Sequence, residues 1–190
     1  MHGLYFRGLS FVIMRVFSPS TVLLLLLCWY APAVQAQSPS YKVLDTYDDL
    51  STLLNRHEET TLLVNFWATY CAPCVQEIPL LDSLQQKYAD RQLKVVLVNL
   101  DFRHQLKQRL EPFLEKYHLS SKVVVLADQD ADSWIPKVSS DWDGGLPFTM
   151  IVKDGKKVPH QQEFNSFDGL EQFVLPHLTP VDLLIAKRKR

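Results

Sequence analysis

The sequence predicts one α/β domain, a central mixed β-sheet flanked by helices, preceded by an N-terminal signal peptide. Three observations predict this fold: strand-like apolar runs alternate with amphipathic helices, an Asp-Gly pair indicates a late hairpin, and a final amphipathic helix closes the chain. With 190 residues, 47% of them hydrophobic and 22% charged, the chain can bury one core and is neither disordered nor collagen-like. A net charge of −1 gives no electrostatic reason to expect nucleic acid as a partner.

The first part of the domain consists of helices and strands in alternation. Helical spacing of apolar residues and short apolar runs predict, in order, a helix over Tyr47–Arg56, a strand over Thr61–Trp67, a helix over Ala72–Tyr88, a strand over Leu93–Leu100 and a helix over Phe102–Tyr117. Pro79 lies inside the second helix and predicts a kink there, because its ring clashes with the carbonyl of Val75.

The last third of the chain has a different pattern. The predicted elements are a strand over Lys122–Leu126, a short helix over Asp130–Val138, a strand over Phe148–Lys153, a strand from Lys156 onward and a helix over Ser166–Leu178. Asp154-Gly155 joins the last two strands, since this pair supplies the positive φ of a hairpin turn. A hairpin added to parallel βα units makes the predicted sheet mixed.

Residues 1–36 have the composition of a secretory signal peptide. They contain no Asp or Glu and only Arg7 and Arg15 as basic residues, and the apolar run that follows ends before small residues up to Ala36. The run is about ten residues long, whereas a membrane-spanning helix needs about 20. Two alternatives stay open: an uncleaved signal that tethers the protein, and a lipoprotein built on Cys28, although Leu27 rather than a small residue precedes it.

The rest of the chain divides into a linker at 37–45, the domain at 46–180 and a basic tail at 181–190. Cleavage after Ala36 removes Cys28, so that two of the three cysteines remain, Cys71 and Cys74. We therefore expect an exported, periplasmic protein in a compartment that permits disulfides. The tail is expected to be solvated.

Cys71-Ala-Pro-Cys74 is the candidate reactive site. It follows a predicted strand and opens a predicted helix, where unpaired amides and the helix dipole lower the pKa of a thiol at Cys71. A thiolate is the nucleophile of disulfide exchange, so Cys71 is expected to attack and Cys74, one turn further on, to resolve the mixed disulfide. Pro73 stiffens the ring that the two cysteines close.

Other uses of the two cysteines were weighed. A structural disulfide so short stabilises little, and a zinc site lacks two further ligands at a metal-binding spacing. A peroxidase on the same fold needs Thr or Ser three residues before the first cysteine, where this chain has Ala68. A copper carrier or chaperone module needs wider cysteine spacing and a histidine tied to the pair.

The segment Leu63–Pro79, LVNFWATYCAPCVQEIP, resembles the active-site segment of the thioredoxin-like superfamily, and more narrowly of exported TlpA/ResA-type thiol–disulfide oxidoreductases. Gly145–Gly155, GLPFTMIVKDG, resembles the cis-proline strand and hairpin of that family. The resemblance implies a thioredoxin fold, in which Pro147 is cis and packs against the cysteines. The backbone of Leu146 then faces the substrate chain and can pair with it as an added strand.

Departures from the family pattern lie beside the cysteines. Tyr70 stands where the family usually has Trp, and Asn65 stands where cytoplasmic thioredoxins carry a buried acid. The resemblance implies that Glu77 replaces that acid and exchanges a proton with the resolving thiol, its pKa raised by burial and by the thiolate. The alternative is a solvated first-turn Glu. Trp67 and Tyr70 flank the site and are expected to form a docking surface, with core packing as the alternative for Trp67.

The resemblance implies that the protein reduces disulfides in other extracytoplasmic proteins through the Cys71–Cys74 pair. It implies a membrane-bound thiol reductase as electron donor and no cofactor beyond the redox-active disulfide. We expect no metal, no nucleic acid and a monomer. A dithiol oxidase of the same fold stays an alternative, because the direction of exchange depends on how strongly the reduced thiolate is stabilised.

Overall fold

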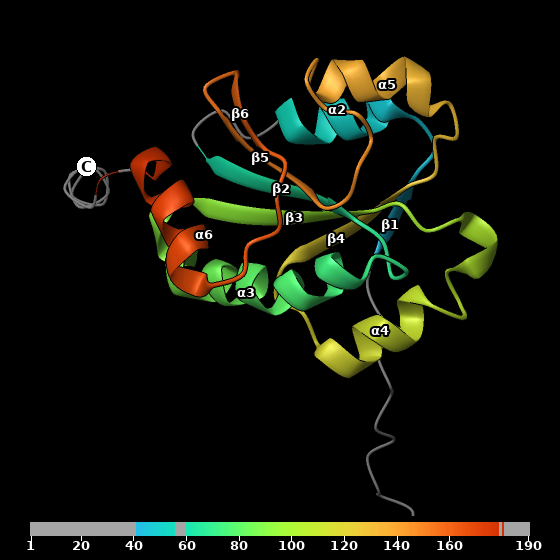
Figure 1. Ribbon diagram of the computed structural model, residues 1–190, viewed down its shortest axis with the longest axis horizontal. Helices are drawn as coiled ribbons and strands as arrows, with labels where there is room; N and C mark the ends of the chain where they lie inside the picture. The colour runs from blue at the N-terminus through green and yellow to red at the C-terminus, as the bar shows by residue number, and fades with distance from the viewer. Residues whose placement is uncertain (1–40, 56–59, 179, 181–190) are drawn as a thin grey trace, which may run out of the picture. The chain divides into compact units, whose positions relative to one another are not determined.

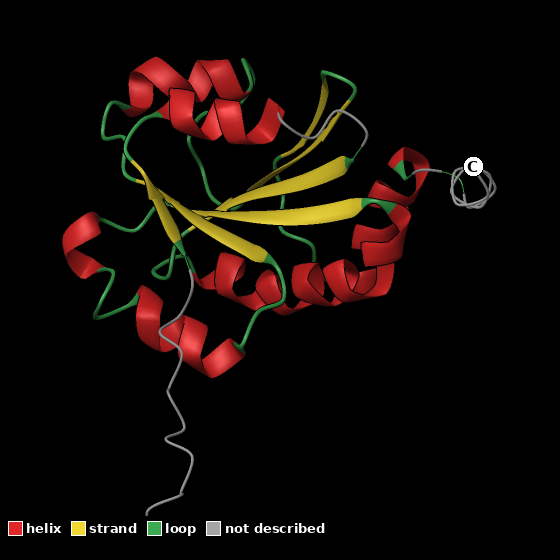
Figure 2. Ribbon diagram, turned by 180° about the vertical axis from the view of Figure 1, so that it is seen from behind, coloured by secondary structure: helices red, strands yellow, loops and turns green. Residues whose placement is uncertain are grey.

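A computed structural model describes residues 41–55, 60–178 and 180, all within one compact unit. These residues form a six-stranded mixed sheet with helices on both faces (Figures 1 and 2). The predicted signal peptide, the first part of the linker and the basic tail lie outside the described residues. Within the described ranges, every helix is too short or too polar to cross a membrane.

The sheet combines four parallel strands with an antiparallel hairpin. Its strands, in chain order, are β1 (Lys42–Leu44), β2 (Thr61–Trp67), β3 (Leu93–Asn99), β4 (Lys122–Leu126), β5 (Phe148–Lys153) and β6 (Lys156–His160). In space the order is β1-β4-β3-β2-β5-β6, with β5 antiparallel to β2. The carboxyl ends of β2, β3 and β4 therefore meet at one end of the sheet, where β5 begins.

Two layers of helices cover the sheet. The helices are α2 (Tyr47–Asn55), α3 (Ala72–Tyr88), α4 (Leu110–Tyr117), α5 (Ala131–Val138) and α6 (Phe167–Val174). Figure 1 shows α2 and α5 on one side of the sheet and α3, α4 and α6 on the other. We call these the α2 face and the α3 face.

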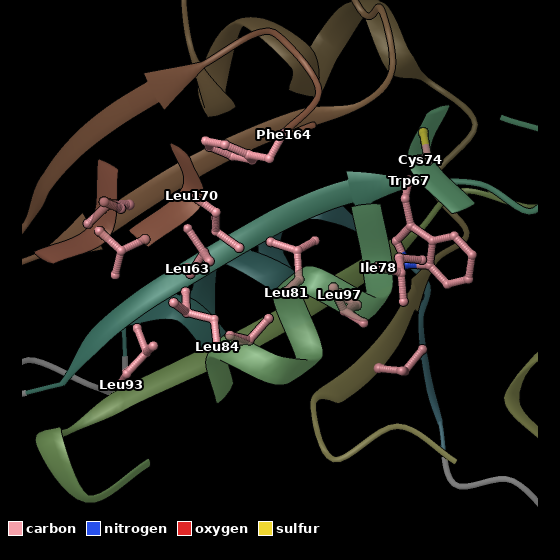
Figure 3. Close-up of a cluster of buried hydrophobic side chains, with 14 of the residues drawn as sticks. Leu63, Trp67, Cys74, Ile78, Leu81, Leu84, Leu93, Leu97, Phe164 and Leu170 are labelled. Carbon is pink, nitrogen blue, oxygen red and sulfur yellow. The ribbon is translucent and has the colours of Figure 1, made fainter. Parts of the chain in front are cut away.

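Side chains of the strands alternate between the two faces, because the side-chain period of a strand is two residues. In β2, Leu62, Val64 and Phe66 belong to the core on the α2 face. Leu63 and Trp67 belong to the core on the α3 face, with Cys74, Ile78 and Leu81 of α3 (Figure 3). Asn65 has the parity of Leu63 and Trp67, and it is fully buried. A polar side chain of the central strand thus lies on the α3 face.

The structure confirms the predicted α/β class and the mixed sheet, and β1 is an addition to it. Residues 42–44 fall within the range predicted as linker, yet they pair in parallel with β4, and Leu44 is buried. A strand of three residues leaves too short a pattern for the alternation rule to detect. The sheet therefore begins before the residue at which the sequence placed the domain.

Two predicted helices have different bounds because of prolines. The helix predicted from Phe102 begins at Leu110, after a short 3-10 turn at Arg103–Gln105. Pro112 tolerates the first turn of a helix, but in a longer helix its ring would clash with the carbonyl of Gln108. The last helix ends at Val174, and Pro176 lies in the 3-10 turn that follows it.

Candidate active site

The cysteine pair lies where β2 ends and α3 begins. Cys71 is the N-cap of α3 with an extended backbone, and its Sγ accepts a hydrogen bond from the Cys74 amide at 3.3 Å. A disulfide joins the two residues, whose Cα atoms are 5.3 Å apart. Cys74 is fully buried, whereas Cys71 is partly exposed. The outer sulfur is thus the one at the helix N-terminus, where the dipole and the free amides stabilise an anion.

Glu77 lies one turn after Cys74 and is buried, with 1% of its surface exposed. The Asn65 side-chain amide donates a hydrogen bond to Glu77 Oε1 at 2.7 Å, and the Phe164 backbone amide donates to Oε2 at 2.9 Å. Asn65 Nδ2 also donates to Thr149 Oγ1 at 2.9 Å. The Glu77 carboxyl group is therefore hydrogen-bonded to β2 and to the loop between β6 and α6. Its partner in β2, Asn65, is in turn hydrogen-bonded to β5.

Burial raises the pKa of Glu77 from 4.5 to about 7. The hydrogen bonds from Phe164 and Asn65 lower the pKa, but by less than the loss of solvation raises it, and the nearby charge of Glu163 adds a smaller increase. Near neutral pH the carboxyl group therefore exists in both protonation states. A group of this kind, one helical turn after a buried cysteine, can take up or release a proton there once the disulfide is reduced. The alternative of a solvated Glu77 is wrong.

A buried aspartate holds the loop that leads to Cys71. Asp101, 2% exposed, accepts a hydrogen bond from the Thr69 amide at 2.9 Å on Oδ1, and Asn99 Nδ2 donates to its Oδ2 at 3.2 Å. The Leu100 amide donates to the Trp67 carbonyl at 2.8 Å, which extends the pairing of β2 and β3. Sequence reasoning missed Asp101. An acid directly after a strand that ends beside the cysteines was the available signal.

Pro147 is buried, and the Leu146–Pro147 peptide bond is cis, as the resemblance implied. In the β2–β5 register Phe66 lies opposite Phe148, the first residue of β5, and Pro147 directly precedes it. The cis-proline therefore stands at the end of the sheet from which the chain continues to Cys71. Leu146, partly buried, contacts the cores of both faces.

The two aromatic residues predicted as a docking surface have different environments. Tyr70 is 55% exposed, directly before Cys71. Trp67 is fully buried, and its ring centroid lies 4.9 Å from that of Phe113. The prediction that Trp67 belongs to a docking surface is wrong, because β2 is covered on both faces and the parity of Trp67 directs it into the α3-face core (Figure 3).

The first turn of α3 also contains Pro73, partly exposed between the two cysteines. A proline there sacrifices no hydrogen bond, because the first amides of a helix have no partner within it. Among the described residues, no group of three or more His, Cys, Asp or Glu side chains is arranged to hold a metal ion.

Comparisons with known proteins relate the chain to thiol-exchange proteins. The sequence profile of the Redoxin family matches residues 31–167. The thioredoxin-like protein YneN of Bacillus subtilis is 34% identical over 47% of this chain and 51% of its own length. The thiol-disulfide oxidoreductase ResA of Halalkalibacterium halodurans is 31% identical over 59% of this chain and 58% of its own length. The chain thus matches less than two thirds of either curated relative.

A solved structure gives a similar result. A protein of Chlorobium tepidum described as thiol:disulfide interchange protein DsbE superposes with a TM-score of 0.53, at 25% identity over 65% of this chain and 83% of that chain. The thioredoxin domain of a Bacteroides vulgatus thiol-disulfide oxidoreductase superposes with a TM-score of 0.51, at 23% identity over 64% of this chain and 84% of that one. The second likeness concerns the fold alone.

Proposed function

Because this chain belongs to the Redoxin family and is a TlpA/ResA-type protein with a thioredoxin fold, we propose that it is an extracytoplasmic thiol–disulfide oxidoreductase that reduces disulfides in exported proteins. One observation carries the proposal: a partly exposed Cys71 caps α3 and is bonded to a buried Cys74, with the buried Glu77 one turn further along the helix. Relatives named as thiol-disulfide oxidoreductases support it.

The proposed reaction starts from the reduced protein. The Cys71 thiolate attacks one sulfur of a substrate disulfide, so that a Cys71–substrate disulfide forms and the other substrate sulfur leaves as a thiolate. The Cys74 thiolate then attacks Cys71 Sγ, the protein disulfide forms and the second substrate sulfur leaves. Two electrons pass from the protein to the substrate, and the oxidised protein is the form described above.

Glu77 has the proton-transfer role in this proposal. Cys74 is fully buried, so its thiol must lose a proton to a nearby group before it can attack Cys71. A carboxyl group whose pKa is about 7 is matched to that task at neutral pH. When the protein is reduced again, the same group returns the proton to the leaving Cys74 thiolate.

The remaining parts of the proposal concern substrate, donor and location. A substrate segment that pairs with the backbone of Leu146 would lie beside Pro147, at the end of the sheet where Cys71 is exposed. A membrane-bound thiol reductase supplies the two electrons for the next cycle, so the chain needs no cofactor besides its own disulfide. The signal-like segment at 1–36 supports export to the periplasm, either free or tethered, and we propose a monomer.

Trapping of the mixed disulfide tests the proposal. In a Cys74→Ser variant the second step is removed, so Cys71 keeps its substrate in a covalent complex that non-reducing gels detect and a reductant releases. A Cys71→Ser variant is the matched control, because it keeps the buried cysteine and loses the attacking one. If the Cys74→Ser variant recovers no more disulfide-linked partner than the Cys71→Ser variant, the exchange mechanism is wrong.

The reduction potential tests the direction of exchange. A value near −270 mV, typical of thioredoxin, fits a reductase, whereas a value near −120 mV, typical of strong oxidants, fits the alternative of a dithiol oxidase. Equilibration with defined ratios of reduced and oxidised glutathione, followed by thiol alkylation, measures it.

A further inference from the structure

Two exposed aromatic residues lie in neighbouring loops next to the cysteine pair. The described residues expose three large apolar side chains: Tyr70 at 55%, Phe102 at 55% and Leu175 at 39%. Tyr70 precedes Cys71 at the end of β2, and Phe102 follows the end of β3. Exposed aromatic side chains that gather at one place on a soluble protein indicate a contact surface.

Backbone hydrogen bonds bring these two loops together. The Leu100 amide bonds to the Trp67 carbonyl at 2.8 Å, and the Thr69 amide bonds to the Asp101 carboxylate at 2.9 Å. Tyr70 and Phe102 are the next residues after Thr69 and Asp101. Figure 1 shows the segment after β3 at the same end of the sheet as the turn from β2 into α3. The buried Asp101 carboxylate therefore fixes the two loops relative to each other.

The segment that begins at Phe102 is strongly basic. Residues 102–109, FRHQLKQR, carry three positively charged side chains, Arg103, Lys107 and Arg109, one histidine and no acidic side chain. Arg103 forms an exposed ion pair with Asp45, and the His104 ring stacks on Phe102 with 5.8 Å between centroids. Lys107 and Arg109 are exposed and form no ion pair with a described residue. Since the whole chain has a net charge of −1, this positive charge is local.

We propose that Tyr70, Phe102, His104, Lys107 and Arg109 form a basic aromatic patch that selects the substrate. The patch favours polypeptides whose reactive disulfide is flanked by an apolar side chain and by acidic residues. The aromatic rings cover the apolar side chain, and the cations attract the acidic residues and raise the rate of productive encounter. This inference rests on the proposed function, because it concerns what the Cys71 thiolate meets.

Two disulfide-bonded peptides test the charge preference. They share one sequence with a leucine beside the disulfide, and they differ only in two flanking residues, which are Glu in one and Lys in the other. The second-order rate constant for reduction by the pre-reduced protein is measured for each. At low salt we expect the Glu peptide to react about tenfold faster, from two exposed charge pairs whose sign changes, with a smaller ratio at high salt.

Charge-reversal variants locate that preference. A Lys107→Glu/Arg109→Glu variant is expected to bring the ratio of the two rate constants below one. The matched control, Lys122→Glu/Lys156→Glu, makes the same change in net charge at the opposite end of the sheet, where β4 and β6 begin. It is expected to keep a ratio well above one. Because a ratio is taken within each protein, a change in thiol reactivity cancels.

A second pair of variants tests the aromatic part. A Phe102→Ser variant is expected to reduce the leucine-flanked peptide several-fold more slowly relative to a glycine-flanked one, whereas Leu175→Ser, the control at the third exposed apolar residue, leaves that ratio unchanged. Equal rates for both charged peptides, or a ratio unaffected by the reversal at 107 and 109, would overturn the patch alone. Failure of the wild-type dithiol to reduce even the small neutral hydroxyethyl disulfide would overturn the proposed function as well.

Discussion

Both faces of the sheet bury a core of apolar side chains, but the polar groups on the two faces differ in their hydrogen bonding. On the α2 face, Phe66 packs against Trp134, Trp142 and Phe148, with ring centroids 4.9 to 6.2 Å apart. The indole N–H groups of Trp134 and Trp142 donate to backbone carbonyls at 3.2 and 2.7 Å.

On the α3 face, some buried polar atoms have no hydrogen-bond partner among the described residues. Among the described residues no donor reaches Asn65 Oδ1 and no acceptor reaches Trp67 Nε1, although both atoms are buried. The same face carries Glu77 with its raised pKa. A fully satisfied aromatic core contributes stability. Spare hydrogen-bonding capacity beside Glu77 costs stability, and it lies where the proposed chemistry needs groups that change protonation. The comparison teaches that the two faces of β2 both bury an apolar core but differ in their polar groups, and that the acid next to the cysteines lies on the α3 face.

Truncation of the α2 face gives the largest expected effect. Phe66→Ala removes a fully buried ring that contacts three aromatic neighbours, and should lower the free energy of unfolding by about 3 to 5 kcal/mol. Urea unfolding followed by tryptophan fluorescence measures it. Phe66→Leu, a milder variant that stays folded, should keep the wild-type pH profile of disulfide exchange. A changed pH profile in that variant would show that the α2 face also affects the chemistry of the site.

Glu77→Gln tests the α3 face. The folded pKa of about 7 exceeds the ordinary value of 4.5, so between these values the folded protein keeps a proton that the unfolded chain has released. Stability present below pH 4.5 is therefore lost as the pH rises through 7, by about 3 kcal/mol. Glu77→Gln should remove this loss, as shown by urea unfolding at pH 4.5 and pH 8.

The same substitution should slow disulfide exchange about 100-fold near neutral pH, because the proton transfer to and from Cys74 loses its group. Stopped-flow fluorescence measures the resolving step. If the Glu77→Gln variant resolves the mixed disulfide at the wild-type rate across the pH range, Glu77 has a structural role only. The two faces of the sheet then do not differ in function.

Asn65→Val should shift the pH profile in a known direction. The hydrogen bond from Asn65 lowers the pKa of Glu77, so its loss should raise that pKa further and move the pH dependence of exchange to higher pH. Thr149→Val is the control, because it removes a hydroxyl partner of Asn65 but leaves the bond from Asn65 to Glu77 in place. A downward shift in Asn65→Val would contradict the role of the Asn65 hydrogen bond in lowering the pKa of Glu77.

Trp142→Phe gives the smallest expected effect. The variant keeps the stacking on Phe148 but loses the hydrogen bond to the Gly145 carbonyl, which should cost about 1 kcal/mol of unfolding free energy. Gly145 directly precedes Leu146-Pro147. An altered rate of disulfide exchange in Trp142→Phe would therefore show that residues on the α2 face also affect the reactive site.

Strong periodic patterns made most of the fold predictable from sequence. The strand at Thr61–Trp67 and the helix at Ala72–Tyr88 have the bounds predicted for them, because buried runs and helical spacing are local signals. β1 was missed because three residues carry too little pattern, and the start of α4 was wrong because the steric effect of Pro112 outweighs amphipathic spacing.

The site was predictable where its residues are close in sequence. Cys71 caps α3, and Cys74 and Glu77 lie in its first two turns, so the spacing indicated the thiol pair and the family resemblance added the acid. The amide of Phe164 reaches Glu77 from 87 residues away through an irregular loop, and such a contact leaves no local pattern. For Trp67 the sequence left a docking surface and core packing both open, because it does not show that Phe113 covers the ring.

The contact between Glu77 and Phe164 has a consequence for how the protein matures. A chain synthesised from its N-terminus presents Cys71 and Cys74 before β5 and the loop at Phe164 have emerged. Contacts between residues so far apart in sequence form late in folding. Until then Glu77 is solvated like any other glutamate. The nascent chain therefore carries two cysteine thiols while the pKa of Glu77 still has its ordinary value. That pKa reaches its folded value only when the C-terminal third of the chain has packed against the rest.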